Sequence, residues 1–572
     1  PTARKAEAVR TMVLLESLQI MMDWLLDLLR YDPQAPLLFV DLFFWGFFAV
    51  ALLGLAFLQR KMAMRNAYLF AISLFFYYKV SGLFLLLLVF STVSDYLIGH
   101  AMHRTDTTWK RKMWLFASVF VNLGLLFYFK YAYFLADFFS DAFGLLWEPK
   151  PYMAIWSNAT FGSDFVETAI ILPVGISFYT FQCLSYTIDL YRKKIKPVNR
   201  VLDFGFFVSF FPQLVAGPIV RASEFLPQLY KETKLTKAAF GLGLFWILNG
   251  LIKKMVLADY VASNFADRVF AQPTLYSGLE CIMALFAYSL QVYADFSGYT
   301  DVAIGVAMLM GFTLTKNFNS PYKATSVSDY WRRWHISLSS WLRDYLYIPL
   351  GGSREGSLAT YVLIFLAAVV LSIMSDTWLV PVGMALLLVT VYALARWVTA
   401  FRQWLNTNIN IMLTMLLGGW WHGASWNFVT WGGLNGLGLV GYKLWKQIRP
   451  WTPQSNVFAR VWAIAITLTF ITFTRAWFRA PGWDEAISIL TRSWTAFDAS
   501  LTGDILHGFW KPLAVMLVGY LIHWIPETMK HAYRQRFAHD PWYVEWSLAL
   551  GAMLFVFQSM SAGSQPFIYF QF

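Results

Sequence analysis

Long apolar runs constrain the fold of this chain more than any other feature of its sequence. They recur from Leu37–Leu58 to Val544–Phe557 and are separated by short polar segments. A helix needs about 20 apolar residues to cross a bilayer, so the runs predict roughly 11 to 14 crossings, several of them broken or half-length. The composition agrees, because 58% of the 572 residues are hydrophobic and only 14% are charged, whereas soluble domains carry about 25%. The sequence therefore predicts an all-α polytopic membrane protein.

One membrane domain, residues 35–572, is expected to follow a short amphipathic segment. In residues 1–34, the leucines and methionines of Met12–Leu29 are interspersed with acidic residues. This pattern predicts a helix that lies along the membrane interface rather than a cleavable signal. In the membrane domain, broken helices at bilayer depth are tolerated only against protein or a wet cavity. The domain is therefore expected to enclose such a cavity.

Basic residues predict the orientation of the chain. The net charge is +12, but Lys and Arg form short clusters between apolar runs, at residues 60–65, 104–112 and 192–200. This distribution is typical of loops and argues against nucleic-acid binding. The three clusters can share one side of the membrane, which the positive-inside rule makes cytoplasmic, with the N-terminus on the far side.

Neither cysteine nor histidine spacing indicates a metal site. Cys183 and Cys281 lie in apolar runs without CxxC spacing, so a disulfide framework is not indicated either. The histidines show no HExxH or similar spacing. No bound metal is expected.

The most distinctive stretch runs from Asp329 to Tyr345. At helical spacing its tryptophans and leucines fall on one side, whereas Arg332, Arg333 and Asp344 tend to the other. This predicts one amphipathic helix along the membrane interface, with a capping residue at its start and Pro-Gly chemistry at its end. His335 is exceptional, because it lies beside the aromatic face rather than among the charged residues.

Two carboxylates interrupt a second stretch, Tyr293–Asp301, that would otherwise be a continuous span. Unpaired charges there would be costly. In one interpretation Asp295 and Asp301 pair with arginines of the Asp329–Tyr345 stretch or accept backbone N–H bonds. In the other, Asp295, Ser297 and Tyr299 contact a substrate directly.

A third stretch, Leu416–Phe428, contains a histidine without a nearby formal charge. Gly419 and Gly423 are spaced so that a neighbouring helix can approach the backbone closely. His422 has two open interpretations. A histidine in a span commonly packs or hydrogen-bonds between helices, but a titratable group inside a membrane also supports a functional hypothesis.

Together these stretches resemble the signature of the membrane-bound O-acyltransferase superfamily. The matching motifs are Leu172–Tyr179, Ser185–Arg192, Phe211–Ile219, Asp295–Tyr299, Trp331–Ser339, Trp341–Tyr347, Leu350–Gly352, Gly419–Gly423 and Pro566–Phe572. The nearest branch is the bacterial alginate O-acetyltransferase type, which is related to the teichoic-acid D-alanyl transferases. The resemblance covers residues 37–572, and its motifs keep the same order.

This resemblance implies a ring of helices around a central funnel in the bacterial inner membrane. It implies that His422 is the essential histidine and His335 its partner in transfer of a short acyl group, most simply acetyl. The donor would be acetyl-CoA or the phosphopantetheine thioester of a cytoplasmic acyl carrier, with no tightly bound cofactor. The acceptor would be a hydroxyl of an extracytoplasmic acyl-relay protein or of a cell-surface polysaccharide.

The chemistry of the residue types agrees with that implication. A neutral imidazole can take the proton of a hydroxyl that attacks a thioester. His335 could orient the acyl group or donate to the developing oxyanion, a role equally open to Asn317, Ser337 and Ser339. A dry pocket would protect the thioester from water, and its expected tryptophans are Trp331, Trp341 and Trp421. Arg332, Arg333 and Arg343 would contact donor phosphates or, equally well, lipid headgroups.

Two apolar runs between the histidines depart from the family pattern. Leu358–Ile373 and Trp378–Val398 predict an inserted pair of helices, residues 358–398, outside the ring. They would offer a docking surface for a partner or for a second copy of the chain. A transporter or flippase would share the hydropathy and the polar cavity, although the internal repeats that favour it are not visible. A structural scaffold would tolerate replacement of both histidines.

Overall fold

The computed structural model describes residues 19, 29–33, 35–163, 165–215, 217–232, 235–375, 377–452, 456–559 and 567. Within those ranges the chain forms helices and no strand, and several helices are apolar enough to span a membrane. The predicted all-α polytopic membrane fold is therefore confirmed. The interfacial helix expected in residues 1–34 lies almost entirely outside the described residues, as does most of the Pro566–Phe572 motif.

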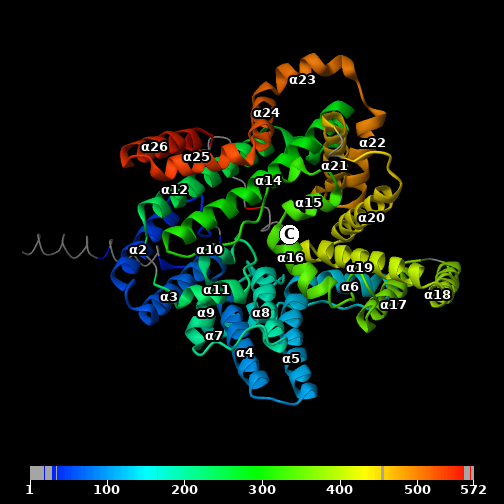
Figure 1. Cartoon of the computed structure of the whole chain (residues 1–572), viewed down its shortest axis with the longest axis horizontal. Coiled ribbons are helices and arrows are strands. Elements are labelled where there is room, and N and C mark those ends of the chain that lie inside the picture. The colour runs from blue at the N-terminus through cyan, green and yellow to red at the C-terminus, as the bar shows by residue number, and fades with distance from the viewer. Residues whose placement is uncertain are drawn as a thin grey trace, which may run out of the picture.

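The helices surround a central region that holds α10, α15 and α16 (Figure 1). The first half of the chain forms α2 Leu42–Leu58, α3 Met62–Ser81, α4 Leu85–His103, α5 Thr108–Leu126, η2 Phe127–Tyr131, α6 Ala132–Phe143, α7 Tyr152–Phe161, α8 Ile176–Tyr191, α9 Val201–Ser209, α10 Phe211–Leu214, α11 Ala222–Leu229, α12 Lys237–Ile252, η3 Lys253–Asp259, η4 Ala262–Ala266, α13 Asp267–Ala271 and α14 Gly278–Leu309. The second half forms α15 Val327–Arg333, α16 Ile336–Leu342, η7 Arg343–Tyr347, α17 Leu358–Ile373, α18 Leu379–Trp397, α19 Thr399–His422, α20 Trp426–Ile448, α21 Val457–Arg479, α22 Trp483–Thr495, α23 Thr502–Gly508, α24 Trp510–Trp524, α25 Glu527–His539 and α26 Trp542–Ser559.

Six helical segments of the described chain are long and apolar enough to cross a membrane, or seven if the bent pair α23–α24 forms one span. This is fewer than the roughly 11 to 14 expected from apolar runs. Some runs form helices that are too short, such as α2. One segment, Met62–His103, is 42 residues long. A straight helix of that length would extend about 63 Å, twice the thickness of a bilayer core. It breaks instead at Gly82, where φ is +58°, and so supplies two helices, α3 and α4.

Glycines bring α12 and α14 into close contact at the centre of the molecule. A Cβ atom added to Gly250 would lie 2.5 Å from the carbonyl oxygen of Gly298, and one added to Gly305 would meet the carbonyl oxygen of Gly243. Small residues let membrane helices approach closely enough for dense backbone packing. The two helices therefore pack backbone against backbone at these glycines.

The carboxylates of α14 bind lysines. Asp295 pairs with Lys254 at 2.6 Å, and Asp301 pairs with Lys253 at 2.6 Å. The prediction that arginines of the Asp329–Tyr345 stretch supply the counter-charges is wrong. Both lysines belong to η3, which continues α12 along α14 and thus lies next to the carboxylates.

The Asp329–Tyr345 stretch is not one interfacial helix. It divides into α15, α16 and the π-helix η7, and the break falls at His335, which has φ +43° and ψ +57°. The segment before α15 stabilises the break. Asn319 N–H donates to the Arg333 carbonyl, and Ile336 N–H donates to the Asn317 carbonyl. The aromatic face of the stretch is buried rather than placed at an interface: Trp334 and Trp341 are 4% and 7% exposed.

Local contacts bring parts of the three basic clusters near one another. Asn199 accepts a hydrogen bond from Tyr96 through its carbonyl, at 2.8 Å. Arg111, in the second cluster, donates to the Tyr191 carbonyl at 2.9 Å. Lys61 and Arg200 line one common cavity. The first and second clusters thus each adjoin the third, through cavity-lining Lys61 and Arg200 and through the contact of Arg111 with Tyr191.

The inserted helices α17 and α18 lie at the edge of the molecule (Figure 1). Thr360 is the one buried residue of α17, and Ala395 is the one buried residue of α18. Thr360 Oγ1 donates to the Leu350 carbonyl at 2.6 Å and lies 3.0 Å from Asn410 Oδ1. This contact ties the start of the hairpin to α19, while most of its apolar side chains face outward.

Candidate active site

The C-terminal end of α19 carries His422, and two side chains of η2 hold it in place. Lys130 Nζ donates to the carbonyls of Trp421 and His422 at 2.7 and 2.9 Å. The Tyr131 hydroxyl donates to the Trp420 carbonyl at 2.9 Å. The last carbonyls of a helix lack partners within it and carry a partial negative charge. The Lys130 ammonium therefore donates hydrogen bonds to these carbonyls and offsets their partial negative charge.

Glycines place α19 directly against α20. A Cβ atom on Gly419 would lie 2.9 Å from Gly432 Cα, so only glycine permits this approach. At Gly423 the backbone becomes extended, with φ −160°, and the helix ends. The glycines thus set both the packing of α19 and the position of its last residue, His422.

Aromatic rings surround the His422 imidazole, which is 3% exposed. The nearest ring centroids are those of Trp421 at 5.0 Å, Trp431 at 5.2 Å and Phe478 at 5.4 Å. The His335 ring is 6.4 Å away. The structure therefore brings the two predicted histidines together in an environment with little water.

His335 is fully buried and is fixed by Asn317. Its ring packs edge-to-face on Phe296, with centroids 4.6 Å apart. Its Nδ1 lies 3.2 Å from Asn317 Oδ1. The same oxygen accepts from the backbone N–H of Ser337 at 3.2 Å and from the Ser337 hydroxyl at 2.9 Å.

These contacts determine the tautomer of His335. A backbone N–H can only donate, so the Asn317 atom that faces Ser337 must be the amide oxygen. That oxygen can only accept, so the proton of the neutral imidazole is on Nδ1 and the lone pair is on Nε2. In this state the side chain cannot donate from Nε2 to an oxyanion, which leaves orientation as the role open to a neutral His335.

A cavity of about 570 Å³, here called cavity A, extends to His422 from one side. Most of its walls come from α15, α16, η7, α19 and α20, and besides His422 it includes four of the predicted residues: Trp331, Arg332, Ser339 and Arg343. Arg343 pairs with Asp344 at 2.7 Å. The Asp344 carbonyl in turn accepts from Arg192 at 3.1 Å, so cavity A approaches the third basic cluster.

A second cavity, of about 90 Å³ and called cavity B, extends to His422 from another direction. It is lined by Lys130, Trp421, His422 and residues 172–178, which form the end of the loop before α8 and the first turn of α8. His422 is the one residue that the walls of cavities A and B share in the described part of the chain. It therefore lies between the two cavities.

The other predicted site residues lie outside the walls of both cavities. Asn317 and Ser337 form the cluster around His335. Arg333 binds Asp329 at 2.9 Å, and Trp341 donates from Nε1 to the Phe181 carbonyl at 3.0 Å. Asp295, Ser297 and Tyr299 are buried within α14, where Phe296 of the same motif supports His335.

Lys130 lines the site although the sequence did not single it out. It lies in an aromatic stretch whose composition resembles an ordinary span, and its partners are carbonyls distant in sequence. The available signal was a lysine near the middle of the apolar Thr108–Phe143 helix, where a charged group normally indicates function. Over the described residues, no group of three or more His, Cys, Asp or Glu side chains could hold a metal ion.

Comparisons with known proteins identify the family. The model of the membrane-bound O-acyltransferase family matches residues 190–391, a range that includes His335 and ends before His422. A peptidoglycan O-acetyltransferase of Helicobacter pylori is 34% identical over 479 residues, which cover 78% of each chain. A probable alginate O-acetylase AlgI of Pseudomonas aeruginosa is 37% identical over 395 residues, 69% of this chain and 63% of that one.

A more distant relative is a teichoic acid D-alanyltransferase of Bacillus subtilis, 26% identical over 317 residues, which are 53% of this chain and 68% of that one. The relatives agree with the family model and with the order of the motifs along the helices described above. The chain belongs to the membrane-bound O-acyltransferase family.

Proposed function

We propose that this protein transfers an acetyl group from a thioester in cavity A to a hydroxyl in cavity B. The observation that carries the proposal is that His422 belongs to the walls of both cavities. The choice of acetyl is supported by the relatives named as O-acetyltransferases, which are more similar than the D-alanyltransferase.

His422 acts as the general base of this reaction. Its imidazole takes the proton of the acceptor hydroxyl while the oxygen attacks the thioester carbonyl. The tetrahedral intermediate then expels the thiolate, which receives the proton from the imidazolium. One C–O bond forms and one C–S bond breaks, so the step needs no further reactant. The aromatic walls exclude water that would otherwise hydrolyse the thioester.

The donor enters from the side of the basic clusters. Arg332, Arg343 and Lys443 line cavity A, and guanidinium and ammonium groups suit the phosphates of coenzyme A or of an acyl carrier's phosphopantetheine. The positive-inside rule makes this side the cytoplasm of a bacterial inner membrane. The acceptor in cavity B is then a hydroxyl of an extracytoplasmic relay protein or polysaccharide.

Thioester cleavage by the purified full-length protein tests the assignment. We expect His422→Ala to abolish transfer from acetyl-CoA or an acetylated acyl carrier to a hydroxyl acceptor, since no other described group is shared by the cavities. In cells, the same change should remove base-labile acetate from the surface polysaccharide. His507, which is exposed and distant in sequence from the cavities, provides the control His507→Ala. Full O-acetylation in the His422→Ala strain, with normal protein levels, would refute the proposal.

A further inference from the structure

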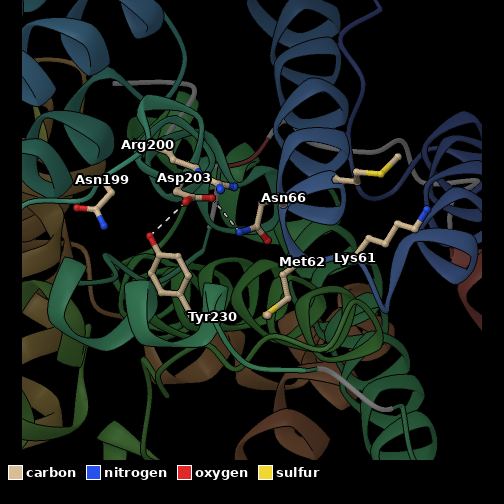
Figure 2. A pocket seen from close by; sticks show the side chains of 9 residues that line it. Lys61, Met62, Asn66, Asn199, Arg200, Asp203 and Tyr230 are labelled. Carbon is tan, nitrogen blue, oxygen red and sulfur yellow. Dashed lines mark hydrogen bonds between the residues drawn. The ribbon is translucent and has the colours of Figure 1, made fainter.

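A third cavity, called cavity C, lies where the starts of α3 and α9 meet the end of α11. Its volume is about 490 Å³, and its walls share no residue with those of cavities A and B. Figure 2 shows Asn66, Asp203 and Tyr230 grouped at one side and Lys61 extending from the rim. The acyl-transfer reaction leaves this cavity without a role.

The one carboxylate among the described residues of cavity C is held by two hydrogen bonds. Asp203 accepts from Asn66 Nδ2 at 2.9 Å through one oxygen and from the Tyr230 hydroxyl at 3.2 Å through the other (Figure 2). Asn66 Oδ1 accepts from the buried guanidinium of Arg65 at 3.0 and 3.2 Å. Through Asn66, the positive charge of Arg65 offsets the negative charge of Asp203.

Two cations on the rim keep their charge uncompensated. Lys61 and Arg200 line the cavity, and neither forms an ion pair with any residue that the structure describes. Arg200 is also the residue that precedes the first turn of α9, so the positive end of that helix dipole adds to the field. With Arg65 and Asp203 cancelling, the cavity presents two positive charges to its contents.

The rest of the wall is apolar. Met62 and Met64, 39% and 51% exposed, lie at the start of the membrane-spanning segment Met62–His103. A ligand here therefore meets cations and methionine side chains together, at the depth where a span begins. Flexible methionines adapt to irregular apolar surfaces, and basic pockets between membrane helices suit acidic lipid headgroups.

We infer that cavity C binds the head group of an anionic phospholipid, with Arg200 on the phosphate, Lys61 adding positive charge from the other side of the cavity (Figure 2), and Met62 and Met64 against the start of the acyl chains. A free phosphate would satisfy the cations but leave the methionines without a contact. The site is independent of the acyl-transfer proposal, because it shares no residue with the catalytic cavities. A lipid bound in cavity C would hold the contact between α3 and α9 at the boundary with the bilayer.

Lipid binding to the purified full-length protein tests this inference, with native mass spectrometry as the readout. We expect phosphatidylglycerol to remain bound in preference to phosphatidylcholine, and millimolar inorganic phosphate to leave it in place. Each of Lys61→Gln and Arg200→Gln should weaken phosphatidylglycerol binding about fivefold, and the double variant about thirtyfold, at roughly 1 kcal/mol per basic residue.

The matched control is the pair Lys110→Gln and Lys112→Gln, which removes two exposed charges from the second basic cluster and should leave binding unchanged. A second variant, Ala63→Trp, fills the cavity without changing its charge and should displace the lipid. Equal binding of phosphatidylcholine, displacement of phosphatidylglycerol by inorganic phosphate, or equal losses in the control pair would each overturn the inference.

Discussion

Lys130 determines where the proposed base lies. Its ammonium holds the carbonyls of Trp421 and His422, and each hydrogen bond from a charged group is worth about 1.5–3 kcal/mol. Lys130→Met keeps the length and apolar stem of the side chain but leaves both carbonyls without this donor. We expect kcat to fall about tenfold to a hundredfold with a smaller change in KM, because the base is misplaced and the cavities keep their walls.

The measurement is steady-state thioester transfer by purified protein. Lys110→Met, on the exposed start of α5, is the matched control and should retain full activity. If Lys130→Met keeps the kcat of the unmodified protein, Lys130 does not position His422.

Asn317 supports His335 in the same way. Its Oδ1 accepts from His335 Nδ1 and twice from Ser337. Asn317→Leu has a similar volume but no acceptor, so the imidazole could reorient or exchange tautomers. We expect activity to fall at least about tenfold, from the loss of several buried hydrogen bonds at about 1 kcal/mol each. Asn317→Asp preserves the acceptor and should retain more activity than Asn317→Leu; the reverse order in a transfer assay would argue against the tautomer assignment.

Part of the candidate site could be predicted from residues alone. The two histidines stood out because each is a titratable group in an apolar setting, and the structure brings their rings within 6.4 Å. The sequence could not show that Asn317 accepts a hydrogen bond from His335. This role depends on the backbone N–H of Ser337, which reaches Asn317 only after the chain has turned at His335. Lys130 was missed for a similar reason, since its partners are carbonyls at the end of a helix distant in sequence.

At the scale of elements, the glycine contacts between α12 and α14 predict that a larger side chain at these positions destabilises the fold. A Cβ on Gly250 would lie 2.5 Å from the Gly298 carbonyl oxygen and 2.8 Å from the Val302 backbone nitrogen. Because both atoms belong to the backbone, relief requires the helices to separate, which also strains the Lys254–Asp295 pair. We expect Gly250→Val to destabilise the fold by about 1–3 kcal/mol or more, seen as a lower melting temperature in detergent.

The control for this prediction is Gly124→Ala in α5, where an added Cβ meets nothing within 4 Å. Alanine favours a helix over glycine by about 1 kcal/mol, so this variant should melt at the same temperature or higher. Equal melting temperatures for Gly250→Val and the unmodified protein would show that α12 and α14 are not held by this contact.

The helical periodicity of the Asp329–Tyr345 stretch predicted that the stretch is helical, but it did not predict the break at His335. Periodicity reports the face that is apolar, and the buried Trp334 and Trp341 do form such a face. It does not report that a separate segment, residues 317–319, supplies backbone partners to Arg333 and Ile336. That non-local pairing stabilises the left-handed conformation of His335, which single-residue propensity disfavours.

At the scale of the whole molecule, hydropathy identified the class of fold, and at least six described helical segments are long and apolar enough to cross a membrane. Apolar length alone does not distinguish a crossing from a buried central helix, and α19 and α20 carry polar residues such as Asn410, Asn427 and Asn435 inside the protein. Side chains that serve an internal cavity lower the hydropathy of the helices that form it. Helices next to the site are therefore the ones a hydropathy count identifies least well.

The arrangement of the cavities leads to a prediction of sidedness. Tyr128 of η2 donates to the Lys150 carbonyl at 2.7 Å, so the loop after α6 lies near cavity B, whereas cavity A approaches the basic clusters. Leu146 in that loop is 96% exposed, and Thr107, within the second basic cluster, is also exposed. The native cysteines, Cys183 and Cys281, are both 0% exposed and should give little background. In intact cells, a membrane-impermeant maleimide should label Leu146→Cys and should label Thr107→Cys only after permeabilisation, because the positive-inside rule predicts that the basic clusters face the cytoplasm. Labelling of Thr107→Cys in intact cells would reverse the direction of transfer, with cavity A, the proposed donor site, opening away from the cytoplasmic thioesters.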